Sequence, residues 1–497
     1  MTARNADRHP SEMHSIDSTI RRLARLARTV PALEASYLVG GAVRDALLGR
    51  PVRELDIASS AATDGAHALA DALGSSVVSL GGQHELYRVP LEGGWIDVTP
   101  IQGGLDADLD RRDFTIDALA LPLRAVPRTL EGLPRDAVID RHRGLDDLDA
   151  GLVRQVSRSS ISEDPVRALR GVRLATTLEF SIEPATEFSI AEAASLLDDV
   201  ALERVGHELE QLLGSRSAAT GFRILERTGL LDRALPELVA GRSISQRPHH
   251  TWDVLEHQLV ALEWMGVLLR DTPPEAEPAA AIWHHTWDEE WRETVWGPVR
   301  AHLEERAPVL RLATLLHDIG KPETRTLEAD GRTRFFGHGP RGAVLAAARL
   351  RALRYPERVI GRISLLLEQH LRPGQVASPG QRPTPRALHR FHQRLGDAAL
   401  DVCFLFLADS LATADPEELL PRWPAYVAHV QRIVGWHPPE AARTIAGLVD
   451  GHAVIEATGI EPGPEVGRIL EEIREAAAAG EITDRNAALD LARQLAG

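Results

Sequence analysis

The fold of the N-terminal part of this chain is decided by the stretch Leu38-Val39-Gly40-Gly41-Ala42-Val43-Arg44-Asp45-Ala46-Leu47-Leu48-Gly49-Arg50, followed closely by Glu54-Leu55-Asp56-Ile57. The apolar run 37–39 predicts a strand, the two glycines allow a tight turn, and 42–48 has the composition and spacing of a helix. The first N–H groups of such a helix are suited to a triphosphate. The stretch therefore predicts a backbone that can approach a phosphate closely.

Acidic residues at a short spacing follow the predicted helix. Glu54 and Asp56 are two apart in an extended segment, so both carboxylates project from one face. Oxygen ligands at this spacing suit Mg²⁺, which takes few protein carboxylates and completes its shell with water and substrate phosphates. Further along, Trp95-Ile96-Asp97-Val98 predicts a short strand with one inward acid. Asp97 is therefore the candidate third carboxylate of this metal site.

A second charged segment is Arg111-Arg112-Asp113-Phe114-Thr115-Ile116-Asp117-Ala118-Leu119. Two adjacent arginines followed by an acid suit an anion clamp better than a core. A glycine pair alone fits an ordinary strand, turn and helix equally well, and the arginine segment weakens that alternative. Together these segments resemble the head of the polymerase-beta-like nucleotidyltransferases, specifically the bacterial CCA-adding enzyme and poly(A) polymerase family.

Length and composition limit the class of protein. The chain has 497 residues, which suggests about three units. Its single cysteine excludes an internal disulfide framework and fits a reducing cytoplasm. No apolar stretch approaches the length of a membrane span, and residues 1–15 lack an apolar signal core. We therefore expect a multidomain cytoplasmic enzyme without a membrane partner.

The net charge of -16 argues against strong affinity for bulk RNA, because a phosphate backbone is bound largely through Lys and Arg. Many of the acids lie in the segment 271–305 and in the Glu-rich C-terminal part. The predicted active region, in contrast, contains Arg111, Arg112, Arg167, Arg170 and Arg173. A local basic cleft on an acidic protein is compatible with this distribution.

Composition also predicts the domain order. Residues 31–145 alternate short apolar runs with Gly-rich turns, which indicates a small α/β head, whereas the sequence beyond Gly151 is rich in helix formers. We expect an α+β protein with a nucleotidyltransferase head at 31–145, a helical neck and body at 146–247, an HD domain at 248–415 and a helical tail at 416–497. Residues 1–30 are expected to be a disordered or partly helical N-terminal tail.

The stretch Ser162-Glu163-Asp164-Pro165-Val166-Arg167-Ala168-Leu169-Arg170 resembles the base-reading motif of the same family. Cytosine and adenine each present an amine donor beside a ring-nitrogen acceptor, whereas uracil and guanine present a carbonyl beside a ring N–H. A carboxylate next to a guanidinium complements the first pair. Asp164 and Arg167 are three apart at a helix start and hence neighbours. The alternative is a capped helix with a surface ion pair.

A third set of residues has the order of an HD-type metal site. The phrase Leu315-Leu316-His317-Asp318-Ile319-Gly320-Lys321-Pro322 closely resembles the HD signature. Histidines and acids from several helices can bind one or two divalent ions and activate water. A single histidine is more often a surface residue than a ligand, but six suitable residues in family order make chance improbable. The candidate ligands are His257, His317, Asp318, His338, His370 and Asp409.

The resemblance covers nearly the whole chain and implies an enzyme that adds C and/or A to the 3′ end of tRNA from CTP and ATP. It implies two Mg²⁺ ions held by Glu54, Asp56 and Asp97. It also implies that the nucleotide is bound by Gly40, Gly41, Arg44, Asp45, Arg112, Asp113, Asp164, Arg167 and Arg170. The HD site would hold Mg²⁺, Mn²⁺ or a transition metal and act as a phosphohydrolase.

The sequence departs from the family pattern in three places. Glu54 stands where the family usually has Asp, and Asp117 where it usually has Asn, which puts an extra negative charge near the triphosphate. The segment Pro100 to Leu105 is much shorter than the loop that many CCA-adding members use to switch from C to A. These departures leave open an A-adding enzyme or poly(A) polymerase, and an HD phosphohydrolase with a weak or inactive head. An RNA-binding protein with two relic sites is the least favoured alternative. The sequence does not define the oligomeric state.

Overall fold

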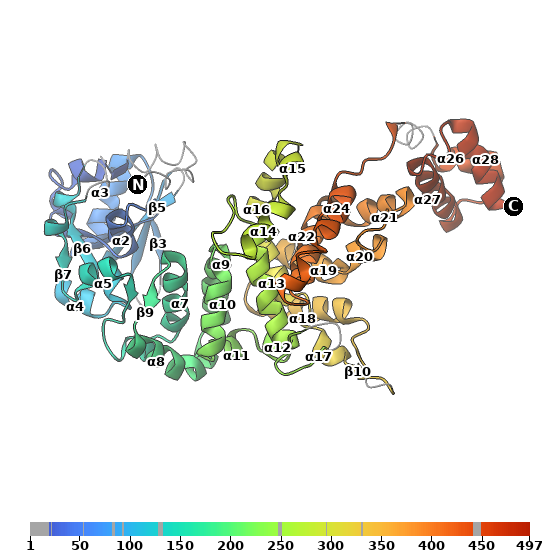
Figure 1. The fold of residues 1–497 in the computed structure, drawn as a ribbon. Coiled ribbons are helices and arrows are strands. Elements are labelled where there is room, and N and C mark those ends of the chain that lie inside the picture. The colour runs from blue at the N-terminus through green and yellow to red at the C-terminus, as the bar shows by residue number, and fades with distance from the viewer. Residues whose placement is uncertain are drawn as a thin grey trace. The chain divides into compact units, whose positions relative to one another are not determined.

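The computed structural model describes residues 19–20, 22–52, 54–81, 85–91, 94–127, 133–246, 251–294, 296–329, 332–440 and 449–497. The chain forms two compact units, coloured along the sequence in Figure 1. The first comprises Met1–Ala201 and Ile224–Arg233, and the second comprises Leu202–Arg223 and Ala234–Gly497. Each unit is described by itself.

The head of the first unit is built on a sheet with strand order β3-β4-β5-β2-β1-β6-β7 among the described residues. Strands β2 and β5 are parallel, and the other neighbours are antiparallel. The predicted α+β class is thereby confirmed. The strands are β1 (Ser36–Val39), β2 (Leu55–Ser59), β3 (Val78–Leu80), β4 (Leu86–Leu91), β5 (Gly94–Pro100), β6 (Leu119–Pro122) and β7 (Ile139–Asp140).

Helices pack on this sheet, as Figure 1 shows for α2 and α3. The apolar side chains of β1, β2 and β5 form the core with them, and Leu38, Ile57, Leu69 and Val98 are all buried. The elements are η1 (Pro31–Leu33), α2 (Gly41–Leu47), α3 (Ala62–Leu73), α4 (Leu105–Asp110), η2 (Thr115–Asp117), η3 (Leu123–Ala125), η4 (Arg135–Ala137) and α5 (Gly144–Ala150).

The predicted N-terminal tail 1–30 lies largely outside the described residues, which omit 1–18 and 21. Residues 22–26 are helical. Leu23 and Ala27 are buried in the core of the head. The last part of the predicted tail therefore belongs to the head, because its apolar side chains pack there.

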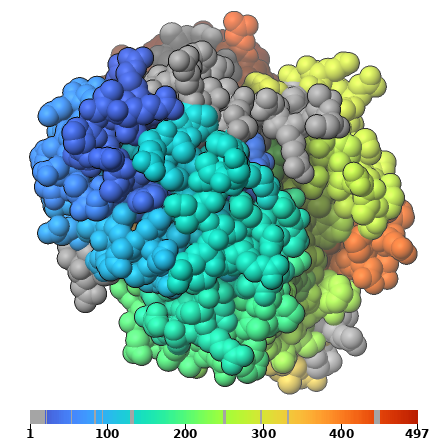
Figure 2. All heavy atoms as spheres, turned by 90° about the vertical axis from the view of Figure 1, so that its left-hand side faces the viewer, coloured from blue at the N-terminus to red at the C-terminus, as the bar shows by residue number. Residues whose placement is uncertain are grey.

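The neck begins within the first unit and continues the surface of the head, as the blue, cyan and green segments of Figure 2 show. A Cβ on Gly171 would lie 2.7 Å from the ring of Phe114, so only glycine allows this close packing. The elements are β8 (Leu152–Val153), α6 (Ser160–Glu163), α7 (Val166–Leu178), β9 (Ser181–Ile182), α8 (Pro184–Glu192), η5 (Ala193–Asp199), α9 (Leu202–Gly214), α10 (Ala218–Arg227), α11 (Leu230–Ala234) and α12 (Pro236–Val239).

The second unit is almost entirely helical. Helix α13 packs against α16 and α22, and α18 packs against α19. From residue 254 on, its elements begin with α13 (Val254–Leu268), α14 (Ala279–Thr286), α15 (Glu289–Thr294), α16 (Trp296–Leu316), α17 (Lys321–Thr324), β10 (Thr326–Leu327), β11 (Thr333–Arg334), α18 (His338–Ala352), α19 (Glu357–Gln369) and α20 (Arg372–Val376). All candidate HD ligands except Asp409 lie on these helices or directly after them.

The second unit ends in further helices. They are α21 (Pro385–Leu395), η6 (Gly396–Ala398), α22 (Ala399–Leu411), α23 (Pro416–Leu419), α24 (Trp423–Val434), α26 (Gly451–Thr458), α27 (Pro464–Ala478) and α28 (Arg485–Ala496). The last three share a small apolar core that includes Val454, Ile469 and Ala488. Within the described residues, no helix is long and apolar enough to cross a membrane.

Candidate active site and metal centre

The glycine turn after β1 lies beside both charged motifs of the head. Gly40 has φ of 67°, a conformation that favours glycine. A Cβ at this position would lie 3.0 Å from a terminal guanidinium nitrogen of Arg112 and 3.9 Å from Oδ2 of Asp56. The turn therefore brings Asp56 and Arg112, both predicted site residues, close to one another.

The sheet register aligns three charged residues across neighbouring strands. Asp56 on β2 is paired with Asp97 on β5, and Asp97 is paired with Arg88 on β4. Glu54 lies just before β2 and is exposed. Burial and the neighbouring Asp97 carboxylate raise the pKa of Asp56 to about 6. Two carboxylates held side by side in this way favour a cation between them.

The carboxylate of Asp97 is held by Arg88, a residue that the sequence analysis did not single out. Arg88 donates from Nε to Oδ1 and from a terminal nitrogen to Oδ2, both at 2.8 Å. The guanidinium also lies 4.4 Å from the centre of the Trp95 ring. In the described residues, Glu54, Asp56 and Asp97 do not bring three ligand atoms within 4.8 Å of one another. The pairing of Arg88 with Asp97 is set by the register of β4 and β5, for which the sequence offers no local signal.

Arg44 is enclosed by acids. Its Nε donates to Asp45 at 2.9 Å, and a terminal nitrogen donates to Asp117 at 2.5 Å. Burial raises the pKa of Asp117, although the Arg44 guanidinium acts in the opposite direction. Asp117 stands where the family usually has Asn. Its carboxylate is paired with Arg44, and this ion pair offsets the extra negative charge expected near the triphosphate.

The paired arginines are fixed by Asp108 on α4. This buried carboxylate accepts from Arg111 and, at 3.3 Å, from Arg112. Arg112 also donates to the backbone carbonyl of Asp117 at 3.3 Å. Sequence reasoning missed Asp108, although its position three and four residues before the arginines on a helix is a usable signal.

Asp113 links the arginine segment to the neck. It accepts from Arg170 at 2.8 Å and from the backbone N–H of Phe114 at 2.9 Å. Burial by itself would raise the pKa of Asp113, but the Arg170 guanidinium outweighs burial and lowers it. Asp113 is therefore a buried anion that ties α7 to the head.

The two residues of the predicted base-reading pair lie close together, Arg167 on α7 and Asp164 between α6 and α7. Arg167 Nε lies 3.9 Å from Oδ2 of Asp164. The guanidinium also donates to the backbone carbonyls of Ser160, at 3.0 Å, and Arg111, at 3.1 Å. These bonds fix Arg167 against the arginine segment.

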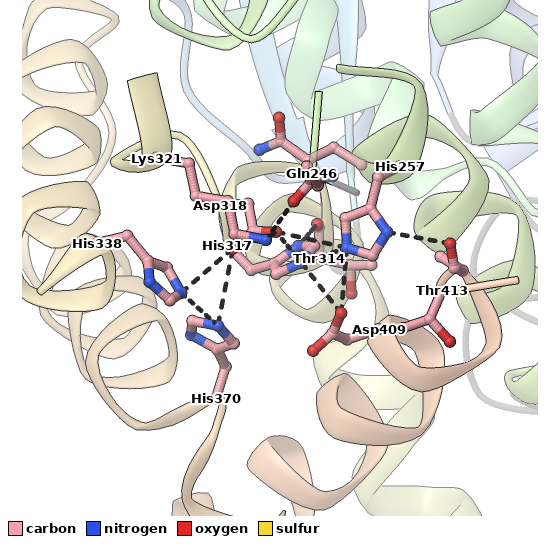
Figure 3. Close-up of polar contacts among 12 residues, drawn as sticks. Gln246, His257, Thr314, His317, Asp318, Lys321, His338, His370, Asp409 and Thr413 are labelled. Carbon is pink, nitrogen blue, oxygen red and sulfur yellow. Dashed lines mark hydrogen bonds and ion pairs between the residues drawn. The ribbon is translucent and has the colours of Figure 1, made fainter. Parts of the chain in front are cut away.

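All six predicted HD ligands come together in the second unit (Figure 3). They form two groups of three, and within each group the ligand atoms lie within 4.8 Å of one another. One group is His257, His317 and Asp409, and the other is Asp318, His338 and His370. The residues come from α13, α18 and α22 and from the segments that follow α16 and α19.

Each of the four histidines is oriented by a backbone carbonyl. The Nδ1 atoms of His257, His317, His338 and His370 contact the carbonyls of Ala412, Thr314, Phe335 and Leu367 at 2.7 to 3.1 Å. Because a carbonyl only accepts, Nδ1 carries the proton, and Nε2 faces the site. The Nε2 atoms meet in pairs, at 3.1 Å for His257 and His317 and 3.2 Å for His338 and His370. These atoms are therefore placed as candidate ligands of a metal ion.

The buried Asp318 and the partly buried Asp409 complete the charge pattern. Burial would raise the pKa of Asp318, but His317 and Lys321 hold it well below its usual range. Burial opposes protonation of His317, yet Asp318 and Asp409 outweigh it and raise its pKa to about 10. Both oxygens of Asp318 face nitrogen atoms: Lys321 Nζ and His317 Nε2 lie 2.5 and 3.2 Å from Oδ2, and His338 Nε2 lies 3.3 Å from Oδ1. A metal cation bound at this site would therefore replace the additional proton that His317 takes up.

Lys321 extends this network. Its Nζ lies 2.5 Å from Oδ2 of Asp318 and 2.5 Å from Oε1 of Gln246, and the side chain is buried. Lys321 therefore contacts the same Asp318 oxygen that His257 and His317 face, whereas His338 faces the other oxygen (Figure 3).

Comparisons with known proteins match three parts of the chain. Residues 36–106 match the poly A polymerase head domain, and residues 281–414 match the HD domain. Residues 179–241 match the family described as "Probable RNA and SrmB- binding site of polymerase A".

Two curated relatives are similar over almost their whole length. The A-adding tRNA nucleotidyltransferase of Deinococcus radiodurans is 34% identical over 91% of this chain and 93% of its own. The CC-adding tRNA nucleotidyltransferase of Thermus thermophilus is 34% identical over 90% of each chain. The solved Thermotoga maritima CCA-adding enzyme complexed with tRNA has a TM-score of 0.58 at 19% identity, over 98% of this chain and 95% of that one. That likeness shows the fold.

The head geometry and these matches define a nucleotidyltransferase with an attached HD domain. More specifically, the chain belongs to the tRNA nucleotidyltransferase family that includes the CCA-, CC- and A-adding enzymes. The comparisons do not favour a poly(A) polymerase, or an HD phosphohydrolase with an inactive head.

Proposed function

We propose that the head transfers C and/or A from CTP and ATP to the 3′ end of tRNA. The observation that carries this proposal is the meeting of the Gly40 turn, Asp56 and Arg112 in one site. The named relatives add either CC or A, and both nucleotides are therefore included.

The metal of the head would be Mg²⁺, held by Asp56 and Asp97 with Glu54 beside them. The raised pKa of Asp56 next to Asp97 fits this assignment, because a cation relieves the repulsion between two carboxylates. When bound, the ions supply activation of the terminal 3′-hydroxyl and neutralise the triphosphate. Gly40 and Gly41 let the backbone approach the phosphates, and Arg44 and Asp45 support that turn. Arg112 lies where its guanidinium can donate to the phosphates, and Asp113 is the next residue in the chain.

Selection of C and A is assigned to Asp164 and Arg167, with Arg170 holding the adjacent Asp113. The carboxylate would accept from the amine of the incoming base, and the guanidinium would donate to its ring nitrogen. The bonds from Arg167 to Ser160 and Arg111 support this role, because they hold the guanidinium still.

Incorporation of each labelled nucleotide into tRNA ending before CCA, and into tRNA ending in CC, tests the proposal. Asp56→Ala should abolish incorporation of both nucleotides. Arg167→Ala should lower the preference over UTP and GTP by roughly 5- to 150-fold, since an unpaired buried polar group costs about 1–3 kcal/mol.

A matched control is Arg135→Ala, which removes an exposed ion pair with Asp149 and should leave incorporation unchanged. Near-normal incorporation by Asp56→Ala would show that the metal assignment is wrong. Wild-type selectivity in Arg167→Ala would reduce the motif to a surface ion pair.

We propose as a second function that the HD site hydrolyses phosphoesters. The paired Nε2 atoms and the carboxylates of Asp318 and Asp409 fit one or two divalent ions, with Mg²⁺, Mn²⁺ or a transition metal as candidates. A bound ion supplies an activated water. Lys321 keeps the Asp318 carboxylate oriented, and backbone carbonyls keep the histidines oriented.

Hydrolysis of a ribonucleoside 2′,3′-cyclic phosphate with Mg²⁺, Mn²⁺ or Ni²⁺ tests this second function. Asp318→Ala should remove the hydrolysis and spare nucleotide addition, because the two sites use different residues. Loss of both activities in a folded Asp318→Ala protein would indicate instead that the metal is structural.

A further inference from the structure

A pocket of about 330 Å³ opens beside one group of HD ligands. His338 and His370 are among its lining residues, so the pocket borders two of the candidate metal ligands. The lining also includes Phe335 and Phe336, from the segment between β11 and α18, together with Leu371 and Arg372. Its volume lies at the small end of the range of about 300–1000 Å³ for small-molecule sites. The pocket therefore suits a single small group attached to the phosphate.

Two large apolar side chains of this pocket are open to water. Phe336 is 76% exposed and Leu371 is 43% exposed. Isolated exposed apolar residues are common, but these two line the same pocket as two candidate metal ligands. The Arg334 guanidinium lies 5.8 Å from the centre of the Phe336 ring, and the remaining exposed part of the ring offers a surface on which a planar ring can stack.

The aromatic segment is tied to the metal site at its base. The carbonyl of Phe335 contacts Nδ1 of His338 at 2.8 Å, and Lys321 Nζ lies 5.5 Å from the Phe335 ring. These contacts anchor Phe335, the residue next to Phe336, beside His338. Phe336 therefore follows an anchored residue and lies two positions before a candidate metal ligand.

The charged groups of the pocket limit the size of the ligand. Arg372 donates to Oε1 of Gln369 at 3.3 Å, which holds its guanidinium at the wall. Glu368, which carries a carboxylate, also lines the pocket. One cation beside one anion suits an ester with a single phosphate better than a polyphosphate.

We propose that this pocket is a base subsite, and that the HD site takes nucleoside phosphoesters whose base stacks on Phe336. This inference rests on the hydrolytic function proposed for the HD site. In the reaction, the oxygen of water bonds to phosphorus, the bond from phosphorus to one ribose oxygen breaks, and that oxygen takes a proton from the water. Phe336 takes no part in these steps and selects the substrate by its base.

The test compares adenosine 2′,3′-cyclic phosphate with methyl riboside 2′,3′-cyclic phosphate, which has the same ester and no base. Wild type should have the lower KM for the adenosine ester. Phe336→Ala should raise that KM by about 5- to 150-fold with kcat little changed, the range expected from base stacking on an aromatic side chain. Phe336→Trp should restore the KM. Val344→Ala is the matched control, because Val344 is 58% exposed on α18 and does not line the pocket.

A binding measurement separates this inference from the proposed hydrolysis. The fluorescent base analogue 2-aminopurine riboside 3′-phosphate is titrated into wild type, Phe336→Ala and Val344→Ala without added metal, and anisotropy is followed. Weaker binding by Phe336→Ala alone supports the base subsite even if neither ester is hydrolysed, in which case the hydrolytic function is wrong. Hydrolysis of both esters with one KM, and identical behaviour of Phe336→Ala and Val344→Ala, would overturn the base subsite and leave the hydrolytic function standing.

Discussion

Arg88→Ala should make the head bind its catalytic metal more tightly. In the structure, Arg88 holds both oxygens of Asp97 with two hydrogen bonds of 2.8 Å. If Asp97 is a metal ligand, an incoming Mg²⁺ ion must displace at least one of these bonds. The arginine therefore competes with the metal for the same carboxylate.

The size of the effect follows from the exposure of this pair. A hydrogen bond to a charged group contributes about 1.5–3 kcal/mol net. The Arg88 side chain is 32% exposed, so water weakens the bond and the lower value, about 1.5 kcal/mol, applies. Since about 1.4 kcal/mol corresponds to tenfold in affinity, the Mg²⁺ concentration for half-maximal activity should fall about tenfold.

The assay is nucleotide addition to tRNA at saturating CTP or ATP across a range of Mg²⁺ concentrations. Arg88→Lys should show a smaller shift, because it keeps the charge and loses the two-pronged contact. Arg135→Ala controls for the loss of an exposed arginine in the head. An unchanged or increased Mg²⁺ requirement in Arg88→Ala would refute the argument that Asp97 is shared between Arg88 and the metal.

Three other predictions follow from single positions. Gly320→Ala should destabilise the second unit by about 1–3 kcal/mol, because the added Cβ would lie 2.1 Å from the carbonyl oxygen of His338. The control is Gly361→Ala on α19, where an added Cβ would meet no atom within 4 Å, and this change should raise the melting temperature slightly. Glu54→Asp should keep or raise the rate of nucleotide addition by restoring the usual family residue, and a loss of more than tenfold would contradict this. Added Mn²⁺ should raise the melting temperature of the wild type but not that of His370→Ala, because a ligand stabilises only a folded state that binds it. Equal shifts of the two melting temperatures in calorimetry would show that the metal binds elsewhere.

Several features of the site followed from the sequence because they depend on local order. The strand, glycine turn and helix around Gly40 need only neighbouring residues, and the structure has β1 and α2 at those positions. The spacing of Asp164 and Arg167 likewise places them as neighbours on the chain. Short-range patterns of this kind are encoded by backbone geometry alone.

Other features could not be predicted, because they depend on which segments lie side by side. The bond from Arg88 to Asp97 depends on the register of β4 and β5. The pairing of Arg44 with Asp117 joins residues 73 positions apart. Asp108 is an intermediate case, since its helical spacing to Arg111 was available in the sequence while its burial was not.

The HD site shows most clearly which features depend on the sequence alone and which depend on the tertiary structure. The six candidate ligands were assigned from the sequence through its resemblance to the HD pattern, and imidazole and carboxylate groups are chemically suited to a divalent cation. Only the tertiary structure decided that they form two groups, that each histidine turns Nε2 inward, and that Phe336 stands open beside His338. The physical reason is that ligand geometry is set by the packing of α13, α16, α18, α19 and α22 and by backbone carbonyls that orient each ring, and those contacts join residues far apart in the chain.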